Sequence, residues 1–235
     1  MIKMVACSFY NTLIDKEDAI AMSTMLEIDK IRNKNIKFVV LTNRSINEVL
    51  YYNKDFPFID YIISFNGNCI LDVNKNKIIY KDYLNKSKIR EILNKYKDRK
   101  IYLYSDNKIL DRTNYTDFNI YKIEIELKKK DLKNLNSNYS VFKYRNKTYL
   151  EVNSNNNYIG MMKLLKSLGI AKEEVLLIIG NESEKGLINL IPNTYIIGNS
   201  PKSLKEMNVK KTSSNNFKGV EKVIKKNIKN SFILK

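Results

Sequence analysis

Long apolar runs and amphipathic stretches take turns along the first third of the chain. Continuous apolar runs at 2–9, 36–42 and 61–65 are typical of strands that are buried on both faces of a sheet. Residues 17–33 instead repeat their apolar positions at helical spacing, and a second helix is expected to begin near Ser45. Because strand–helix–strand connections are right-handed, this order predicts a mostly parallel sheet flanked by helices.

The middle of the chain has a different pattern. An Asn66-Gly67 pair between two apolar runs indicates a hairpin. From 82 to 152, a short amphipathic helix is followed by segments with period-two alternation, and a lysine-rich helix is expected near 128–135. Such alternation is typical of antiparallel strands with one buried face. Residues 82–152 are therefore predicted to form an inserted α+β unit.

The α/β pattern resumes after this segment. A helix is predicted from residue 157 and a buried strand at 174–180. A short helix, a strand at 194–198, a second short helix and a terminal helix from about 218 follow in that order. The predicted fold is therefore α/β, with a Rossmann-like core of residues 1–81 and 153–235 and an α+β cap domain inserted between its two halves.

Composition limits the classes of function. The chain has 235 residues, of which 43% are hydrophobic, so it can bury a large core. Cys7 and Cys69 lie in apolar runs, which favours small buried side chains over a disulfide or a metal pair. The chain has no histidine, the commonest general base. No apolar run approaches the roughly 20 residues of a membrane helix, and the N-terminus lacks the order of a signal peptide, so we expect a cytoplasmic protein without a membrane partner.

The formal net charge of +17 raises the question of nucleic-acid binding. Lysine is far commoner than arginine, and the positive charge is spread from Lys34 through 128–130 to Lys226 instead of following one predicted face. This distribution favours solvated surfaces, and a nucleic-acid partner is not expected.

Several segments resemble the haloacid dehalogenase (HAD) superfamily. ACSFYNTLID at 6–15 resembles its first motif, in which a strand ends in Asp-x-Asp-Gly-Thr-Leu, and FVVLTNRS at 38–45 is similar to its second motif. DYIISFNGNCILD at 60–72 is similar to a hairpin of the Cof-type (IIB) phosphatases, which carry an α+β cap of the C2B type. YLEVNSNNNYIGMMKLLKSLGI and VLLIIGNESEKGLINLI are similar to the regions of the third and fourth motifs. The resemblance covers essentially the whole chain and implies the HAD fold with an inserted cap.

The resemblance also implies a reaction. In that family the first acid of the first motif attacks a phosphoryl group, and the acid two residues later transfers the proton of the leaving group. Mg²⁺ allows the carboxylate to approach an anionic phosphate. A threonine or serine of the second motif and a lysine of the third-motif helix bind phosphoryl oxygens, while acids of the fourth motif hold the metal.

This chain departs from the family pattern at the positions that carry the chemistry. The nucleophile, the acid/base group, the third-motif lysine and three metal-site positions correspond, in that order, to Ser8, Tyr10, Asn157, Asn181, Glu184 and Lys185. The count that leads to Asn157 leaves a shift of one residue open, and Lys163 lies a turn or more further along. We therefore expect no metal cofactor, and Mg²⁺ only if a hydrolase activity has been kept.

Residues that the resemblance assigns to the phosphate pocket or its turns are kept. They are Thr12, Thr42, Arg44, Gly180 and Asn199. With Asn157 and Lys185, the polar members of this set are candidate ligand-binding residues. A pocket with cations and few acids favours an anion without the help of Mg²⁺.

Three functions remain open at this point. The first is a catalytically inactive pseudophosphatase that binds a phosphorylated small molecule, another anion or a protein partner. The second is a residual or altered Mg²⁺-dependent hydrolase of small phosphate esters, such as sugar phosphates or nucleotides. The third, an interaction or nucleic-acid module, rests on charge alone. Because Ser8 would need a base that histidine does not supply, and Lys185 is more simply explained as a cation in the metal's place, the first is favoured.

Overall fold

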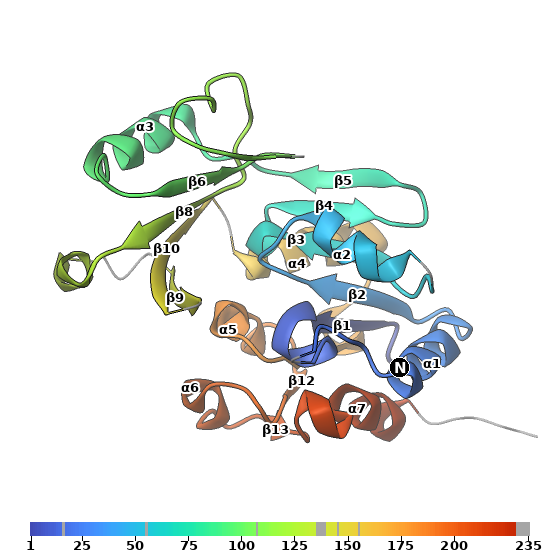
Figure 1. The fold of residues 1–235 in the computed structure, drawn as a ribbon. Coiled ribbons are helices and arrows are strands. Elements are labelled where there is room, and N and C mark those ends of the chain that lie inside the picture. Colours follow the sequence, from blue (N-terminus) through green and yellow to red (C-terminus); the bar gives the residue numbers. More distant parts are fainter. Residues whose placement is uncertain are drawn as a thin grey trace, which may run out of the picture. The chain divides into compact units, whose positions relative to one another are not determined.

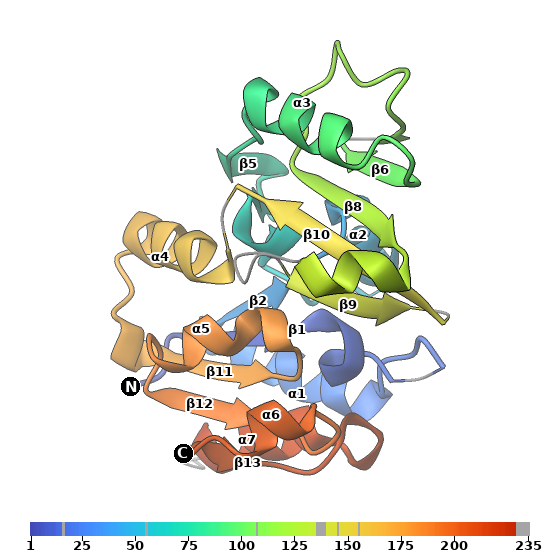
Figure 2. The ribbon, with the colours of Figure 1, turned by 90° about the vertical axis from the view of Figure 1, so that its left-hand side faces the viewer.

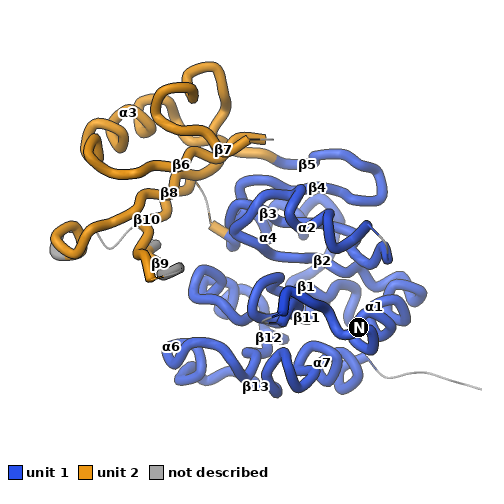
Figure 3. Tube along the Cα trace, viewed as in Figure 1, with its two compact units in different colours: residues 1–80, 157–235 blue, residues 81–156 orange. Residues whose placement is uncertain are grey.

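The computed structural model describes residues 1–228 except 16, 55, 107, 135–139, 145 and 155. Two compact units make up the chain (Figure 3). The first, called the core unit, comprises residues 1–80 and 157–235, and the second, called the inserted unit, comprises residues 81–156. Among the described residues, no helix combines the length and the apolar character that crossing a membrane requires.

A mixed sheet of eight strands runs through the core unit (Figure 1). Its strands are β1 (Met4–Ser8), β2 (Lys37–Leu41), β3 (Tyr61–Ser64), β4 (Cys69–Asp72), β5 (Lys77–Lys81), β11 (Val175–Ile179), β12 (Asn193–Ile196) and β13 (Lys210–Lys211). Their spatial order is β13-β12-β11-β1-β2-β3-β4-β5. Neighbours from β13 to β3 are parallel, and β4 pairs antiparallel with β3. The predicted α/β architecture with a mostly parallel sheet is confirmed.

Helices cover both faces of this sheet (Figures 1 and 2). They are α1 (Met22–Arg32), α2 (Ile46–Asn53), α4 (Asn157–Leu168), α5 (Lys185–Ile188), α6 (Lys202–Lys205) and α7 (Gly219–Asn227). Because successive residues of a strand point to opposite faces, β1 contributes Val5 and Cys7 to a cluster with α1 and α7, and Met4 and Ala6 to a second cluster with α4. The sheet is therefore buried on both sides.

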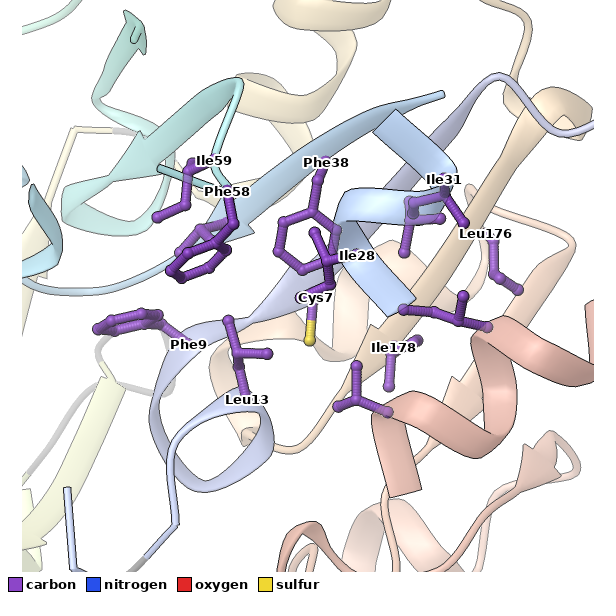
Figure 4. Packing of buried hydrophobic residues seen from close by; sticks show 14 of the residues in the cluster. Cys7, Phe9, Leu13, Ile28, Ile31, Phe38, Phe58, Ile59, Leu176 and Ile178 are labelled. Carbon is purple, nitrogen blue, oxygen red and sulfur yellow. The ribbon is translucent and has the colours of Figure 1, made fainter. Parts of the chain in front are cut away.

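Figure 4 shows part of the first cluster, in which Cys7 lies among Leu13, Ile28 and Phe38. Cys7 and Cys69 are both free and buried, which confirms the prediction that they act as small hydrophobic side chains. Complete burial of an aliphatic or aromatic side chain stabilises a fold by about 1.5–3 kcal/mol relative to exposure. The apolar runs of the sequence are thus the main source of stability for the core unit.

The helix predicted near Ser45 begins there because of a capping box. The Ser45 hydroxyl accepts a hydrogen bond from the Glu48 backbone N–H, and the Glu48 carboxylate accepts one from the Ser45 N–H. Such reciprocal bonds satisfy donors that a helix leaves unpaired in its first turn. They fix the start of α2 directly after the second-motif segment.

The inserted unit has an antiparallel sheet with the order β7-β6-β8-β10-β9. Its elements are α3 (Lys86–Lys95), β6 (Ile101–Tyr104), β7 (Ile109–Leu110), β8 (Lys122–Leu127), β9 (Ser140–Tyr144) and β10 (Lys147–Asn153). Buried residues of α3 and of alternate strand positions form one apolar cluster. The unit therefore has a core of its own.

The lysine-rich helix predicted near 128–135 is present as a 3-10 helix and not as an α-helix. It forms a 3-10 turn at Lys129–Asn134, and residue 135 lies outside the described residues. The segment has no apolar face to bury, because Leu132 is exposed, and its consecutive lysines repel one another. Instead, the Asp131 carboxylate accepts hydrogen bonds from the Lys128 N–H and from Arg99, which holds a short turn.

Candidate functional site

Three parallel strands of the core unit end next to one another at the motif segments. β1 ends at Ser8, β2 ends just before Thr42, and β11 ends just before Gly180. Since β11, β1 and β2 are neighbours in register, their carboxyl ends lie at one edge of the sheet. In open α/β sheets this edge is where ligands bind. The fold therefore brings the first, second and fourth motif segments together.

Ser8, at the position that the resemblance assigns to the nucleophile, is enclosed in the protein. Its side chain is 0% exposed, and its hydroxyl donates a hydrogen bond of 2.6 Å to the Glu184 carboxylate. The same oxygen accepts a hydrogen bond of 3.3 Å from the Gly180 N–H. Both the proton and one lone pair of the hydroxyl are thus used within the protein.

Glu184 ends the short turn η5 (Glu182–Glu184) and is 2% exposed. Besides the Ser8 hydroxyl, its carboxylate accepts hydrogen bonds from the backbone N–H and the side-chain amide of Asn181, at 3.1 and 3.4 Å. Burial raises the pKa of Glu184 to about 7, against the opposing effect of these hydrogen bonds. The buried carboxyl group thus changes its charge near neutral pH.

Tyr10, at the acid/base position, lies in the turn η1 (Phe9–Leu13) after β1. The Arg44 guanidinium lies over its ring at 4.4 Å from the centroid, and Arg44 also pairs with Glu48 at 2.9 Å. Burial raises the pKa of Tyr10 to about 12, although Arg44 opposes this shift. The phenol is therefore protonated at neutral pH and cannot act as a base. Its backbone carbonyl accepts a hydrogen bond of 3.1 Å from the Asn181 amide.

Three further candidate residues are buried at this edge of the core unit. The Thr42 hydroxyl accepts a hydrogen bond of 3.1 Å from the Arg44 backbone N–H. Asn157 is the first residue of α4, and its amide donates a hydrogen bond of 3.4 Å to the Asn66 side chain. The hydroxyl of Thr12 and the amide oxygen of Asn157 are buried without a hydrogen-bond partner among the described residues. Buried polar atoms of this kind point to a missing partner, such as water or a ligand.

The remaining predicted residues are exposed. Lys185 follows Glu184 directly and begins α5. The side chain of Asn199 donates a hydrogen bond of 2.7 Å to the Asn11 carbonyl and accepts one of 3.0 Å from the Asn215 N–H, so it holds the turn after β1. Lys163 is also exposed, with its ammonium 5.5 Å from the centroid of the Tyr80 ring. Neither Lys185 nor Lys163 makes an ion pair within the described part of the chain.

The donors at this edge do not suit Mg²⁺, the metal that the family resemblance implies. Mg²⁺ takes about six hard oxygen ligands, usually including one or two carboxylates. Here a serine hydroxyl and a tyrosine phenol occupy the two first-motif positions that are acids in the family. The Asn181 amide donates a hydrogen bond to the Tyr10 carbonyl, and the Glu184 carboxylate accepts one from the Ser8 hydroxyl. The described residues contain no group of three or more Asp, Glu, Cys or His side chains arranged to hold a metal ion.

Gly180 is packed so closely that it has no room for a side chain. A Cβ at this position would lie 2.2 Å from Thr12 Oγ1 and 3.0 Å from Ile197 Cγ2. We therefore expect Gly180→Ala to lower the free energy of unfolding by about 1–3 kcal/mol. The overlap with Oγ1 disappears in Thr12→Ala, so the double variant is expected to be more stable than the sum of the two single effects predicts.

Urea unfolding of the four proteins in this double-mutant cycle measures that coupling. Because Thr12 Oγ1 has no hydrogen-bond partner among the described residues, Thr12→Ala removes no internal hydrogen bond. Strictly additive losses would contradict the close approach between Gly180 and Thr12.

Comparison with known proteins agrees with the motifs. Residues 5–116 match the family model of the haloacid dehalogenase-like hydrolases. A putative phosphatase of Buchnera aphidicola subsp. Baizongia pistaciae is 31% identical over 125 residues, which are 52% of this chain and 46% of that protein. The match therefore spans about half the length of the curated relative.

Solved structures resemble the chain along nearly its whole length. A haloacid dehalogenase-like hydrolase from B. subtilis has a TM-score of 0.83 at 15% identity and covers 95% of this chain and 99% of its own. A HAD phosphatase from Bacteroides thetaiotaomicron has a TM-score of 0.83 at 15% identity, with coverages of 96% and 95%. A HAD subclass IIB sugar phosphatase has a TM-score of 0.77 at 15% identity, with coverages of 95% and 98%. The resemblance read from the motifs is thereby confirmed: the chain has the fold of the haloacid dehalogenase-like hydrolases, and residues 5–116 carry the sequence pattern of that family.

Proposed function

We propose that this protein is a pseudophosphatase: it binds a phosphorylated or other anionic ligand, or a protein partner, and does not carry out the metal-dependent phosphoryl transfer of its family. The observation that carries this proposal is the hydrogen bond of 2.6 Å between the buried Ser8 hydroxyl and Glu184. A side-chain nucleophile must reach the phosphorus atom, and Ser8 is 0% exposed.

The other changed positions support the same conclusion. Tyr10 is a protonated phenol at neutral pH, so it cannot accept a proton as the family's second acid does. Loss of general acid/base assistance alone slows a reaction by about 10²–10⁴. In this chain the loss is combined with a missing carboxylate nucleophile and with donors that suit Mg²⁺ poorly.

Binding of an anion remains well supported. The chain keeps Thr12, Thr42 and Arg44, and the Thr12 hydroxyl is buried without a partner among the described residues. Hydroxyl and cationic donors of this kind bind phosphoryl oxygens. The similarity to a putative phosphatase and to a sugar phosphatase structure favours a phosphorylated small molecule as the ligand class.

A thermal-shift panel tests this function. Sugar phosphates, nucleotides, inorganic phosphate and sulfate are each added with Mg²⁺ and with EDTA. We expect at least one phosphorylated compound to raise the unfolding temperature equally under both conditions. Lys185→Gln is expected to weaken this shift, while Lys172→Gln, another exposed lysine that begins a short helical turn, leaves it unchanged. Flat melting curves across the whole panel would contradict the proposal.

One observation favours a second candidate, a hydrolase that uses Ser8 as nucleophile. Glu184 supplies the base that histidine cannot, since it accepts the Ser8 proton and its pKa of about 7 suits proton transfer at neutral pH. In such a reaction Glu184 takes the Ser8 proton, the Ser8 oxygen attacks phosphorus, and the ester P–O bond breaks as the phenol of Tyr10 protonates the leaving oxygen. Water that gives a proton to the Tyr10 phenolate then cleaves the phosphoserine, and the Ser8 oxygen regains its proton from Glu184. This path requires the enclosed Ser8 to become accessible.

Phosphate release from the same panel separates the two candidates. The hydrolase hypothesis requires turnover that disappears in both Ser8→Ala and Glu184→Gln. Turnover that survives in both variants indicates a contaminating phosphatase. Ligand-induced stabilisation without any phosphate release supports the pseudophosphatase.

A further inference from the structure

The C-terminal part of the core unit carries a concentration of positive charge. Residues 201–228 contain eight lysines and two glutamates, about a third of the formal net charge of +17 in about an eighth of the chain. These residues form α6, the edge strand β13 and α7, which follow one another at one end of the sheet of the core unit (Figure 2). We call this set of elements the basic edge. Its lysines are Lys202, Lys205, Lys210, Lys211, Lys218, Lys222, Lys225 and Lys226.

All eight lysine side chains of the basic edge are exposed. Two are partly neutralised: Lys202 lies 3.6 Å from Glu206, and Lys225 lies 2.6 Å from Glu221. The other six make no ion pair with the described residues. Lys225 also lies 3.8 Å from Glu27 of α1, and the Glu182 carboxylate accepts a hydrogen bond from Ser203 of α6, so the surrounding core unit offsets only part of the positive charge of the basic edge.

The lysines are distributed around the end of the sheet. α6 packs its Leu204 against the apolar cluster on one face, and α7 packs Val223 and Ile224 against the cluster on the other face. β13 lies between the two helices, and both of its residues are exposed lysines. Charge therefore extends from one face of the sheet across its edge to the other face, as an extended polyanion requires.

The basic edge also contains an exposed aromatic side chain. Phe217, in the turn η6 (Asn215–Phe217) between β13 and α7, is 71% exposed. It directly precedes Lys218, whose backbone has a φ of 58°. A phenylalanine in solvent adds nothing to the core, but it offers a flat face on which a base can stack.

We propose that the basic edge binds single-stranded nucleic acid, with lysines of α6, β13 and α7 on the phosphates and Phe217 stacked on a base. Lysine side chains that track a backbone, combined with an aromatic platform, are the pattern of sequence-tolerant single-strand binding. The side chains that carry the proposal are separate from Ser8, Glu184 and the other candidate residues of the motif edge. This inference is therefore independent of the proposed function and stands or falls separately.

Fluorescence anisotropy with a labelled oligouridine of about 20 nucleotides tests the proposal on the full chain. If about five lysines contact phosphates, the dissociation constant is expected to rise about a hundredfold between about 50 and 200 mM salt. Lys205→Glu/Lys211→Glu/Lys222→Glu, with one change in each element of the basic edge, should abolish binding. Phe217→Ala should weaken it by about fivefold or more, while Phe217→Trp retains it.

Matched variants separate a local surface from a general effect of net charge. Lys86→Glu/Lys95→Glu/Lys97→Glu changes three exposed lysines of the inserted unit by the same total charge and should leave the affinity nearly unchanged. Equal losses in the two triple variants would overturn the proposal, as would equal binding of Phe217→Ala and the wild type. If the glutamate variant fails to fold by circular dichroism, the corresponding triple glutamine variant replaces it.

A last comparison excludes a different polyanion. Vesicles that contain phosphatidylserine carry negative charge but no bases on which Phe217 can stack. Binding to oligouridine with no co-sedimentation on these vesicles supports the proposal. Co-sedimentation without oligouridine binding would overturn it in favour of a membrane surface.

Discussion

Ser8→Asp, which introduces the acid found at this position of the family's first motif, is expected to destabilise the protein in the absence of divalent metal. The new carboxylate would lie beside Glu184, whose oxygen is 2.6 Å from the hydroxyl that it replaces. Two buried carboxylates at this distance cannot both be ionised, and an uncompensated buried charge costs about 3–5 kcal/mol. For a chain of this size, that loss lowers the unfolding temperature by about 10 °C.

Mg²⁺ is expected to reverse part of this loss. A divalent cation between the two carboxylates removes their repulsion, and a ligand that binds only the folded state stabilises it. Differential scanning fluorimetry of wild type, Ser8→Asp and Ser8→Asn, each with EDTA or with about 10 mM Mg²⁺, measures the effect. Ser8→Asn has similar size without the charge, so its unfolding temperature should not respond to the metal. Equal unfolding temperatures for Ser8→Asp and Ser8→Asn under both conditions would refute this account of the site.

This expected result shows how the site can persist without the family's acids. The Ser8 hydroxyl donates a hydrogen bond to the buried Glu184 carboxylate, whereas an ionised acid at position 8 would have no proton to donate and would repel it. In the same way, the amide of Asn181 donates to the Tyr10 carbonyl, where a carboxylate would be repelled. The substitutions are therefore physically consistent with one another, and together they favour a site that is stable without metal.

The strands of the core unit could be predicted because their burial is visible in the sequence. β1, β2, β3 and β11 are nearly continuous apolar runs, and a parallel sheet between helices requires such runs. Because β11, β1 and β2 are neighbours in the sheet, Ser8, Thr42 and Gly180 lie at one edge, as the resemblance of their motifs to the family implies. The lysine-rich helix was predicted at about the right place, but its 3-10 form at Lys129–Asn134 could not be predicted, because a charged segment without an apolar face does not specify the kind of helix.

The chemistry within the site could not be predicted to the same degree. Ser8 and Glu184 are 176 positions apart, and no local pattern indicates that their side chains meet. With no histidine in the chain, Lys185 was the only base that sequence reasoning considered for Ser8, whereas in the structure the buried carboxyl group of Glu184 is in contact with the hydroxyl. The concentration of lysines at 201–228 is visible in the sequence, but the basic edge was missed because the sequence does not show that α6, β13 and α7 place these lysines on both faces and the edge of one sheet.

The second large effect concerns pH and follows from the buried Glu184. Burial raises its pKa in the folded state from 4.5 to about 7. Between these values the folded protein binds a proton that the unfolded chain releases. The contribution of this group to stability is therefore greatest below about pH 4.5 and is lost as the pH rises through about 7. A shift of this size corresponds to about 3 kcal/mol in the free energy of unfolding.

Glu184→Gln removes the titration and keeps the size of the side chain. We expect wild type to lose up to about 3 kcal/mol relative to Glu184→Gln when urea unfolding is measured first at about pH 5 and then at about pH 8. Glu182→Gln, which removes an exposed carboxylate of the same turn, is the matched control and should follow the wild-type curve. Parallel curves for wild type and Glu184→Gln would mean that this carboxyl group titrates as it does in water, which would contradict its burial against Ser8.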